Sequence, residues 1–310
     1  MDDNRLKTNL AGVELKNPVI AASGTFASGK EFAGIFDIGR LGAITVKGLS
    51  HKPWNGNPPP RVTETYAGML NAVGLQNMGA RHFIENDLPF LKERGSRVIV
   101  NLCGRSFGDY LDVARDFQAP NGAGVDLFEL NISCPNIDAG GMAIGTDPAL
   151  TEKLTREVKG LLGAPLFVKL SPNVTSVTEI ALAAEAGGAD GLSLINTLLG
   201  MKIDIAGRRP LLGNTFGGLS GPAIKPVAVR MVYQVAKATG LPIIGMGGVS
   251  TAEDAVEFIM AGATAVAVGT ASFKNPLATV RVVEGLLEYM EKNDIASLDE
   301  IRGCALHENN

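Results

Sequence analysis

The sequence predicts a (β/α)8 TIM barrel that forms a single domain over residues 1–310. Short apolar, β-branched runs alternate with amphipathic segments, a pattern typical of parallel strands whose two faces are covered. Eight strands close such a barrel, and eight runs are present: 18–22, 43–47, 97–102, 125–132, 166–170, 191–196, 242–245 and 265–268. The amphipathic segments predict helices at 147–162, 177–186, 224–239, 252–261 and 276–290.

An open doubly wound sheet is the main alternative fold. It normally carries a G-x-G-x-x-G motif after its first strand. No such motif follows residues 18–22, and Gly245-Met-Gly-Gly-Val-Ser250 comes late and lacks the final glycine. The barrel is therefore favoured. Residues 7–16 alternate around Ala11-Gly12, so we expect an N-terminal β-hairpin that covers the barrel bottom.

The composition indicates a globular protein with a small ligand. Of the 310 residues, 45% are hydrophobic and 19% charged, and the formal net charge is -4 without a basic block. This argues against nucleic acid or an anionic membrane as partner. No uncharged run approaches the roughly 18 residues of a membrane span, and residues 1–7 have no apolar targeting core, so we expect a cytoplasmic protein. Three cysteines and three histidines without ligand spacing predict no metal site.

Three long segments that follow strands are expected to form the ligand site. They cover residues 51–80, 134–146 and 197–221 and are rich in uncharged asparagine and glycine. In a (β/α)8 barrel the chemistry belongs to the loops at the carboxyl ends of the strands. We therefore expect these long βα loops to lie over the C-terminal face and to enclose a bound ring as a lid.

Glycines after the last two strands indicate a phosphate site. Gly247-Gly248 and Gly269-Thr270 each end a strand just before a helix, where backbone N–H groups can hold an anion. A single Gly-Gly pair is more often only a tight turn, but two such turns on adjacent strands favour phosphate. Because a dinucleotide motif is absent, the expected cofactor is a mononucleotide such as FMN.

Two lysines and three asparagines at strand ends suggest what else the site holds. Lys47 and Lys169 end the second and fifth strands within apolar runs, and a buried ammonium needs an acidic partner or a bound anion. A salt bridge would satisfy either lysine alone. The two together favour a flavin, whose reduced ring is anionic, and a substrate carboxylate. Asn101, Asn131 and Asn196 also end strands, where amides can hold a ring imide without adding charge.

Cys134 follows the fourth strand, in Asn131-Ile-Ser-Cys-Pro-Asn136. A thiol at the carboxyl end of a barrel strand, flanked by two asparagines, is placed to take a proton from a small molecule that the amides hold. The alternative is an inert side chain, since free cysteine is among the most buried residue types.

Six motifs occur in order along nearly the whole chain: Asn71-Ala-Val-Gly-Leu75, Asn131-Ile-Ser-Cys-Pro-Asn136, Ile195-Asn-Thr197, Gly218-Leu-Ser-Gly-Pro222, Gly245-Met-Gly-Gly248 and Val268-Gly-Thr270. Together they resemble the catalytic subunit of class 1 dihydroorotate dehydrogenases. Further stretches are similar to the NAD-linked subtype 1B rather than the fumarate-linked subtype 1A: Asn57-Pro-Pro-Pro-Arg61, Gly140-Gly141 with Gly145-Thr-Asp147, and Gly221-Pro-Ala-Ile-Lys-Pro-Val-Ala-Val-Arg230.

The resemblance implies oxidation of (S)-dihydroorotate to orotate in de novo pyrimidine (UMP) biosynthesis. It assigns Cys134 as the base that removes the C5 proton while a hydride passes from C6 to N5 of FMN, and it sets Lys169 near flavin N1 and O2. The implied substrate contacts are Lys47, Asn71, Ala72, Val73, Gly74, Leu75, Asn131, Asn196 and Thr197. The implied FMN contacts are Ser23, Lys47, Gly48, Asn101, Asn131, Lys169, Ile195, Gly221, Gly247, Gly248, Gly269 and Thr270.

The resemblance also implies a partner. Electrons would reach NAD through a second subunit that carries FAD and a [2Fe–2S] cluster, within a heterotetramer built on a homodimer of this chain. The chain itself has neither a dinucleotide motif nor the thiolates for a cluster. Three alternatives stay open: a dihydropyrimidine dehydrogenase-like flavin barrel acting on dihydrouracil, a fumarate-linked class 1A enzyme, and a non-catalytic flavin-binding barrel. Lys47 favours dihydroorotate, because dihydrouracil has no carboxylate.

Overall fold

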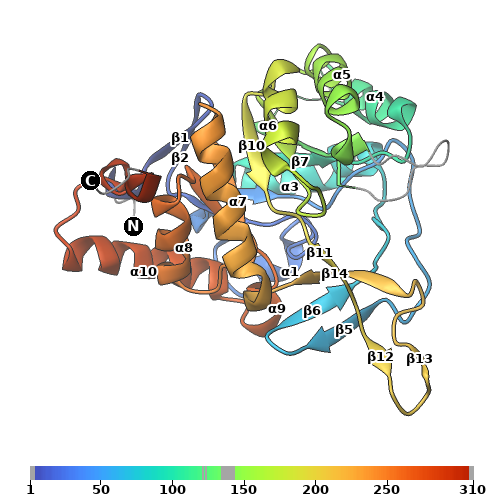
Figure 1. The fold of residues 1–310 in the computed structure, drawn as a ribbon. Helices are drawn as coiled ribbons and strands as arrows, with labels where there is room; N and C mark the ends of the chain where they lie inside the picture. Colours follow the sequence, from blue (N-terminus) through green and yellow to red (C-terminus); the bar gives the residue numbers. More distant parts are fainter. Residues whose placement is uncertain (1–3, 121, 123, 134–143, 307–310) are drawn as a thin grey trace.

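Eight parallel strands close into a barrel, as the sequence predicts (Figure 1). The structure is a computed structural model that describes residues 4–120, 122, 124–133 and 144–306. The barrel strands follow one another around the ring in chain order, and each overlaps one predicted run. They are β3 (Val19–Ala21), β4 (Ala43–Thr45), β7 (Val98–Leu102), β8 (Leu127–Asn131), β9 (Leu166–Lys169), β10 (Gly191–Leu194), β15 (Ile243–Met246) and β16 (Ala265–Val268).

Helices cover the outside of the barrel (Figure 1). The five predicted helices are present as α5 (Pro148–Lys159), α6 (Val177–Ala186), α7 (Lys225–Ala238), α8 (Ala252–Met260) and α10 (Ala278–Lys292). The further helices are α1 (Lys30–Ala33), α2 (Ala80–His82), α3 (Leu88–Glu93), α4 (Phe107–Asp116) and α9 (Ala271–Lys274). Ser106, Ser176 and Thr251 cap α4, α6 and α8, because each side chain accepts a hydrogen bond from a first-turn N–H. Within the described ranges, no helix has the length and apolar character needed to cross a membrane.

Residues of the barrel strands point alternately to the helices and to the barrel interior. In β8, Phe128 and Leu130 pack in the core shared with the helices, whereas Leu127 packs inside the barrel. Phe167 of β9 also points inward, and a Cβ at the neighbouring Gly191 would lie 2.2 Å from its ring. Gly191 therefore makes the space in which Phe167 fills the barrel floor.

The N-terminal hairpin covers the bottom of the barrel, as the sequence predicts. It consists of β1 (Thr8–Leu10) and β2 (Val13–Leu15), paired antiparallel. Leu10 and Leu15 are fully buried and belong to the same apolar cluster as Leu127 and Phe167. Because the bottom is closed by apolar side chains, a ligand has access only from the opposite, carboxyl-terminal face.

Two of the three long segments form an antiparallel sheet rather than irregular loops. Residues 51–80 supply β5 (Val62–Thr65) and β6 (Gly68–Asn71), and residues 197–221 supply β11 (Leu198–Met201) and β14 (Phe216–Ser220). The strands pair in the order β11-β14-β6-β5. A short hairpin of β12 (Ile203–Asp204) and β13 (Arg209–Pro210) projects beyond this sheet (Figure 1). Backbone hydrogen bonds therefore couple two loops that are far apart in the sequence.

We expect Leu10→Ala to destabilise the protein. The side chain is fully buried in the apolar cluster at the barrel bottom, so its truncation leaves a cavity that costs about 2–5 kcal/mol. Urea unfolding of the apoprotein measures the loss. Glu14→Ala, on the exposed side of the same hairpin, is the matched control and should change the free energy of unfolding by less than about 1 kcal/mol. Equal losses in both variants would contradict the buried role of the hairpin.

Candidate functional site

Polar side chains replace apolar ones inside the barrel towards the carboxyl ends of four neighbouring strands. Asn101 of β7 lies in register with Glu129 of β8, and Asn131 at the end of β8 lies in register with Lys169 of β9. Ser193 of β10 is the register partner of Lys169 on its other side. We call these five residues the polar layer. It lies above the apolar floor and forms the base of the candidate site.

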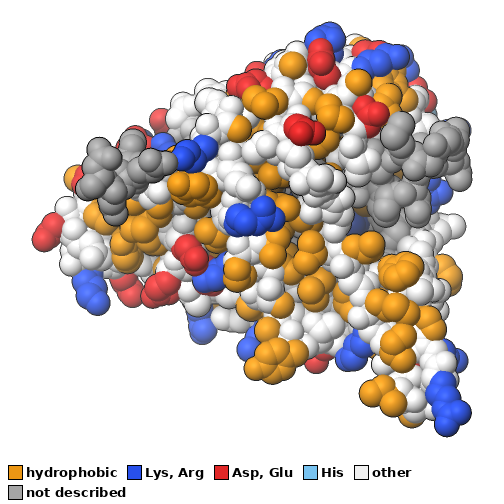
Figure 2. Space-filling view, viewed as in Figure 1, with side chains coloured by type: hydrophobic (Ala, Val, Ile, Leu, Met, Phe, Trp, Pro, Cys, Tyr) orange, Lys and Arg blue, Asp and Glu red, His pale blue; other side chains and the backbone are white. Residues whose placement is uncertain are grey.

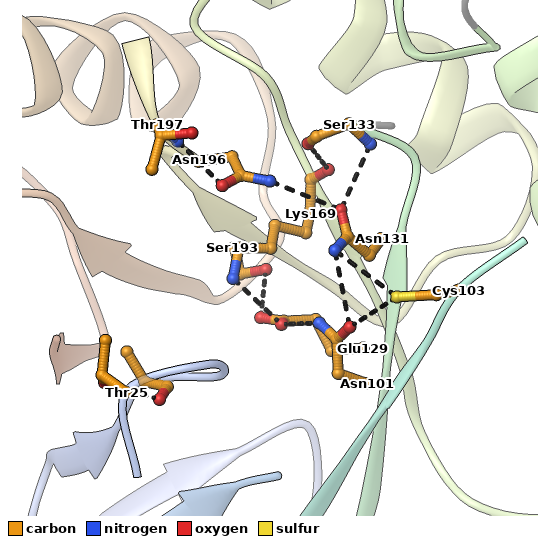
Figure 3. Close-up of polar contacts among 11 residues, drawn as sticks. Thr25, Asn101, Cys103, Glu129, Asn131, Ser133, Lys169, Ser193, Asn196 and Thr197 are labelled. Carbon is orange, nitrogen blue, oxygen red and sulfur yellow. Dashed lines mark hydrogen bonds and ion pairs between the residues drawn. The ribbon is translucent and has the colours of Figure 1, made fainter. Parts of the chain in front are cut away.

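Glu129 is the centre of the polar layer (Figure 3), and its side chain is only 1% exposed. Its Oε1 accepts a hydrogen bond from Asn101 Nδ2 at 2.5 Å and lies 3.3 Å from Lys169 Nζ. Its Oε2 accepts a hydrogen bond from Ser193 Oγ at 2.7 Å. The ion pair that the sequence left open for Lys169 is therefore present. Glu129 and Lys169 are the only charged side chains buried among the described residues, and each compensates the desolvation of the other.

Amides and a thiol extend the polar layer (Figure 3). Asn131 Nδ2 donates to Asn101 Oδ1 at 3.5 Å, and Cys103 Sγ donates to the same oxygen at 3.1 Å. Asn131 Oδ1 accepts from Asn196 Nδ2 at 3.5 Å, and the Thr197 N–H donates to Asn196 Oδ1 at 2.8 Å. The three predicted asparagines thus come together, and they offer both donors and acceptors to a planar polar ring.

Lys47 lies two residues beyond β4 and is half-buried. No carboxylate of the described residues pairs with it. Burial lowers the pKa of its ammonium, the Cys103 thiol nearby opposes this shift, and the Lys169 ammonium adds to it. An ammonium whose charged form is disfavoured in this way is stabilised by an anion bound beside it. Lys47 is therefore suited to hold a carboxylate.

The antiparallel sheet holds the start of the predicted substrate segment, residues 71–75, against the middle of β14. Asn71 Nδ2 donates to the Gly218 carbonyl at 3.4 Å. From the other side, Asn57 donates through Nδ2 and its backbone N–H to the carbonyls of the two residues after Asn71, at 2.9 and 3.0 Å. Gly218 also packs on Thr197, because an added Cβ would lie 2.1 Å from Thr197 Oγ1. The sheet therefore brings together substrate contacts predicted from both long segments.

Backbone N–H groups after β15 and β16 are suited to hold a phosphate. Gly247 and Gly248 have φ values of 120° and 88°, and Gly269 and Thr270 follow the neighbouring strand. Considering only the described residues, none of these four N–H groups has a hydrogen-bond acceptor. Lys225, which packs against Gly248, directs its ammonium to two carboxylates of α8 instead. Amides without partners on adjacent strands are the donor set that a phosphate requires.

The remaining predicted FMN contacts lie at the same ends of other strands: Ser23 after β3, Gly48 after β4, Ile195 after β10 and Gly221 after β14. Packing requires a glycine at position 48, since a Cβ there would lie 2.4 Å from the Cys103 sulfur and 2.7 Å from Asn101 Oδ1. Cys134, the predicted base, lies outside the described residues. The contacts of all these residues with ligands stay predictions.

Glu129, Ser193 and Cys103 belong to the site, but the sequence reasoning did not single them out. Glu129 stands two residues before Asn131 in a predicted strand and therefore shares its inward face. Like Lys47 and Lys169, Glu129 is a charged residue in an apolar run, where it needs a partner, and this signal is present in the sequence. Cys103 carried no such signal, because a small buried thiol is common in protein cores.

Comparisons with known proteins show one family along nearly the whole chain. Residues 5–290 match the family model described as "Dihydroorotate dehydrogenase". A relative from Alkaliphilus metalliredigens is 60% identical over 96% of this chain and 98% of its own. Relatives from Lachnoclostridium phytofermentans and Geotalea uraniireducens are 59% and 53% identical, over 95% and 97% of this chain and 97% and 98% of theirs. All three are named "Dihydroorotate dehydrogenase B (NAD(+)), catalytic subunit".

We expect Lys47→Met to stabilise the apoprotein near neutral pH. Because the pKa of Lys47 is lowered on folding, its charged form destabilises the folded state at neutral pH. This penalty shrinks as the pH rises towards the ordinary value of 10.5, above which the lysine is neutral in both states. Urea unfolding at several pH values should therefore show that Lys47→Met has a larger free energy of unfolding than the wild type, and that this difference becomes smaller as the pH rises. Lys274→Met, at an exposed position, is the control. A difference in free energy of unfolding that does not change with pH would contradict the lowered pKa of Lys47.

Proposed function

Since the chain belongs to the dihydroorotate dehydrogenase family, we propose that it is the catalytic subunit of an NAD-linked type B enzyme that oxidises (S)-dihydroorotate to orotate in pyrimidine biosynthesis. The relatives that carry this name are similar over nearly the whole chain. The observation that carries the substrate assignment is Lys47, a half-buried cation without a carboxylate partner among the described residues, next to a layer of amides. We retain the cytoplasm as the proposed location.

FMN fits the donors that the barrel offers. When bound, it supplies the acceptor for the hydride that leaves C6 of the substrate. The four N–H groups after β15 and β16 would hold its phosphate, because they have no acceptor in the described part of the chain. Asn101, Asn131, Lys169 and Lys47 would face its ring, and Ser23, Gly48, Ile195 and Gly221 would surround it.

Dihydroorotate fits the remaining groups. Lys47 would pair with its carboxylate, and the amides of Asn71, Asn131 and Asn196 would bind the ring carbonyls and N–H groups. Thr197 and the backbone of residues 72–75 would complete the contacts. Because Gly218 connects Asn71 with Thr197, the antiparallel sheet would fix the ring orientation and exclude water from it.

Cys134 is the proposed base. Its thiolate would remove the proton from C5 while the hydride leaves C6, so that a double bond forms between these two carbons. An ordinary cysteine has a pKa of about 8.5, and the thiolate is the basic form. The rate of substrate oxidation should therefore rise through mildly alkaline pH.

Two further chemistries and one non-catalytic role are the competing proposals. Dihydrouracil lacks the carboxylate that would engage Lys47, and fumarate as electron acceptor is disfavoured because the relatives' names specify NAD(+). A barrel that only binds flavin has no need of a base at position 134.

An assembly is part of the proposal. The relatives are named catalytic subunits, and we propose that this chain forms a homodimer and joins a second subunit with FAD and a [2Fe–2S] cluster to reach NAD. Exposed apolar side chains support a protein contact: Leu199, Met201, Ile203, Ile205 and Phe216 are 61%, 42%, 49%, 87% and 54% exposed on and beside β11, β12 and β14. Figure 2 shows hydrophobic side chains gathered over this region, as is typical of protein interfaces.

Dihydroorotate should bleach the visible flavin absorbance of the purified, FMN-loaded chain under anaerobic conditions, and dihydrouracil should not. The physical reason is the carboxylate, which only dihydroorotate offers to Lys47. Stopped-flow absorbance measures the reduction. Bleaching by dihydrouracil alone would overturn the substrate assignment, and no bleaching by either would support a non-catalytic barrel.

The base is tested in the same assay with Cys134→Ala and Cys134→Ser. We expect both variants to retain FMN, because Cys134 is not among the proposed FMN contacts. Reduction should be about 100-fold or more slower in the alanine variant, since a positioned base contributes about 10²–10⁴-fold, and the serine variant should lie between it and the wild type. An alanine variant reduced at the wild-type rate would remove Cys134 from the mechanism.

Electron transfer to NAD should require the second subunit. The chain alone should be yellow and reducible by dihydroorotate, yet it should form no NADH, since it has no dinucleotide motif. NADH absorbance, followed before and after addition of the purified FAD and iron–sulfur subunit, measures this step. NADH formation by the chain alone would contradict the proposed partner.

A further inference from the structure

The carboxylate of Glu129 lies in the proposed flavin site, and no step of the proposed reaction uses it. We propose that Glu129 is a positioning residue that holds Lys169 and Asn101 at the flavin ring and, through its negative charge, limits how strongly the site favours a reduced, anionic flavin. This inference rests on the proposed function, because it concerns the same FMN site.

Three donors from three different strands fix the position of Glu129. Asn101 Nδ2 and Lys169 Nζ both bind Oε1, and Ser193 Oγ binds Oε2 (Figure 3). The Asn101 contact determines the orientation of that amide, because Nδ2 faces the carboxylate and Oδ1 therefore faces Cys103 and Asn131. The Lys169 contact uses one of three ammonium protons. Within the described part of the chain the other two have no acceptor and could serve a bound ring, so Glu129 sets which groups the polar layer presents to the cofactor.

The charge of Glu129 matters because two lysines serve the same site. Lys169 contributes to lowering the pKa of Lys47, so the two ammonium groups act on each other. Both would stabilise negative charge on a flavin ring, and Glu129 is the buried carboxylate that offsets one of them. Glu129, Lys169 and an oxidised ring together are neutral. Without the Glu129 carboxylate, Lys169 and an oxidised ring together carry one positive charge, and they become neutral only when the ring is anionic. A poorly solvated site would then favour the anionic ring.

A purely structural role explains the ion pair less well. Replacement of a buried ion pair by apolar residues of similar volume is often neutral or stabilising, and the barrel floor below it is filled by apolar side chains. In the described ranges, the only buried charges belong to the polar layer, where the flavin ring would lie. The balance also suits the proposed acceptor, because NAD is a weak oxidant and takes electrons only from a flavin that does not hold them too strongly.

Sulfite binding to the FMN-loaded protein tests this proposal without substrate or partner. Sulfite adds to N5 of oxidised flavin, bleaches its visible absorbance and leaves negative charge on the ring. Titrations should compare the wild type with Glu129→Gln, Lys169→Met and the double variant. We expect sulfite to bind at least about tenfold more tightly in Glu129→Gln and at least about tenfold more weakly in Lys169→Met, with the double variant between them; tenfold corresponds to about 1.4 kcal/mol.

Glu288→Gln is the matched control, because it makes the same change of charge on the exposed face of α10. It should change sulfite affinity by less than about twofold, since exposed charges are screened by solvent. If Glu129→Gln does not retain FMN, the comparison of Lys169→Met with the double variant still measures the effect of the Glu129 charge. The double variant should then bind sulfite at least about tenfold more tightly than Lys169→Met does. A purely structural role would lower the unfolding midpoint of Glu129→Gln and leave sulfite affinity unchanged.

The outcomes separate this inference from the proposed function. Equal sulfite affinities with and without Glu129, in a chain that dihydroorotate bleaches, would overturn the role of Glu129 alone. Bleaching by dihydrouracil alone would overturn the proposed substrate, and the sulfite series would still decide the role of Glu129. A wild-type chain that binds no FMN would overturn both.

Discussion

The contact of Glu129 with Lys169 exists only because the barrel keeps neighbouring strands in parallel register. Asn101, Glu129, Lys169 and Ser193 come from four successive barrel strands, and all four occupy inward positions towards the carboxyl ends of these strands. Asn101 is in register with Glu129 and Lys169 with Ser193, and Lys169 stands two residues beyond Phe167, the register partner of Glu129. A one-residue shift of any strand would turn its side chain towards the helices. Register is in turn held by apolar packing, both against the helices and on the barrel floor, where Gly191 makes space for Phe167.

The site divides its work between side chains and backbone. The polar layer carries the buried charges and the asparagine amides, whereas the N–H groups after β15 and β16 offer hydrogen bonds without any side-chain charge. In the proposed site, backbone dipoles would hold the phosphate end of FMN, and the ion pair of Glu129 and Lys169 would lie at its ring. Lys47, which has no carboxylate partner among the described residues, is the cation proposed to bind the substrate carboxylate.

The antiparallel sheet adds a second level of organisation above the barrel. It joins residues 62–71 with residues 198–220 and so fixes Asn71 relative to Thr197. The same sheet carries the exposed apolar side chains of β11 and β14. The proposed substrate contacts and the proposed protein contact therefore lie on one sheet, which would connect assembly with substrate binding.

By itself, the sequence determined the eight barrel strands, the five longer helices that it predicted, the N-terminal hairpin and the family, because alternating periodicity and local motifs are properties of neighbouring residues. The gathering of Asn101, Asn131 and Asn196 also followed, since strand ends of a closed barrel meet at one face. The tertiary structure decided what depends on pairing between distant segments. It joined two long loops into a sheet, and it gave Lys169 a buried partner on another strand while leaving Lys47 without one among the described residues. Those outcomes depend on register and on distances across the barrel, which a single strand's sequence does not contain.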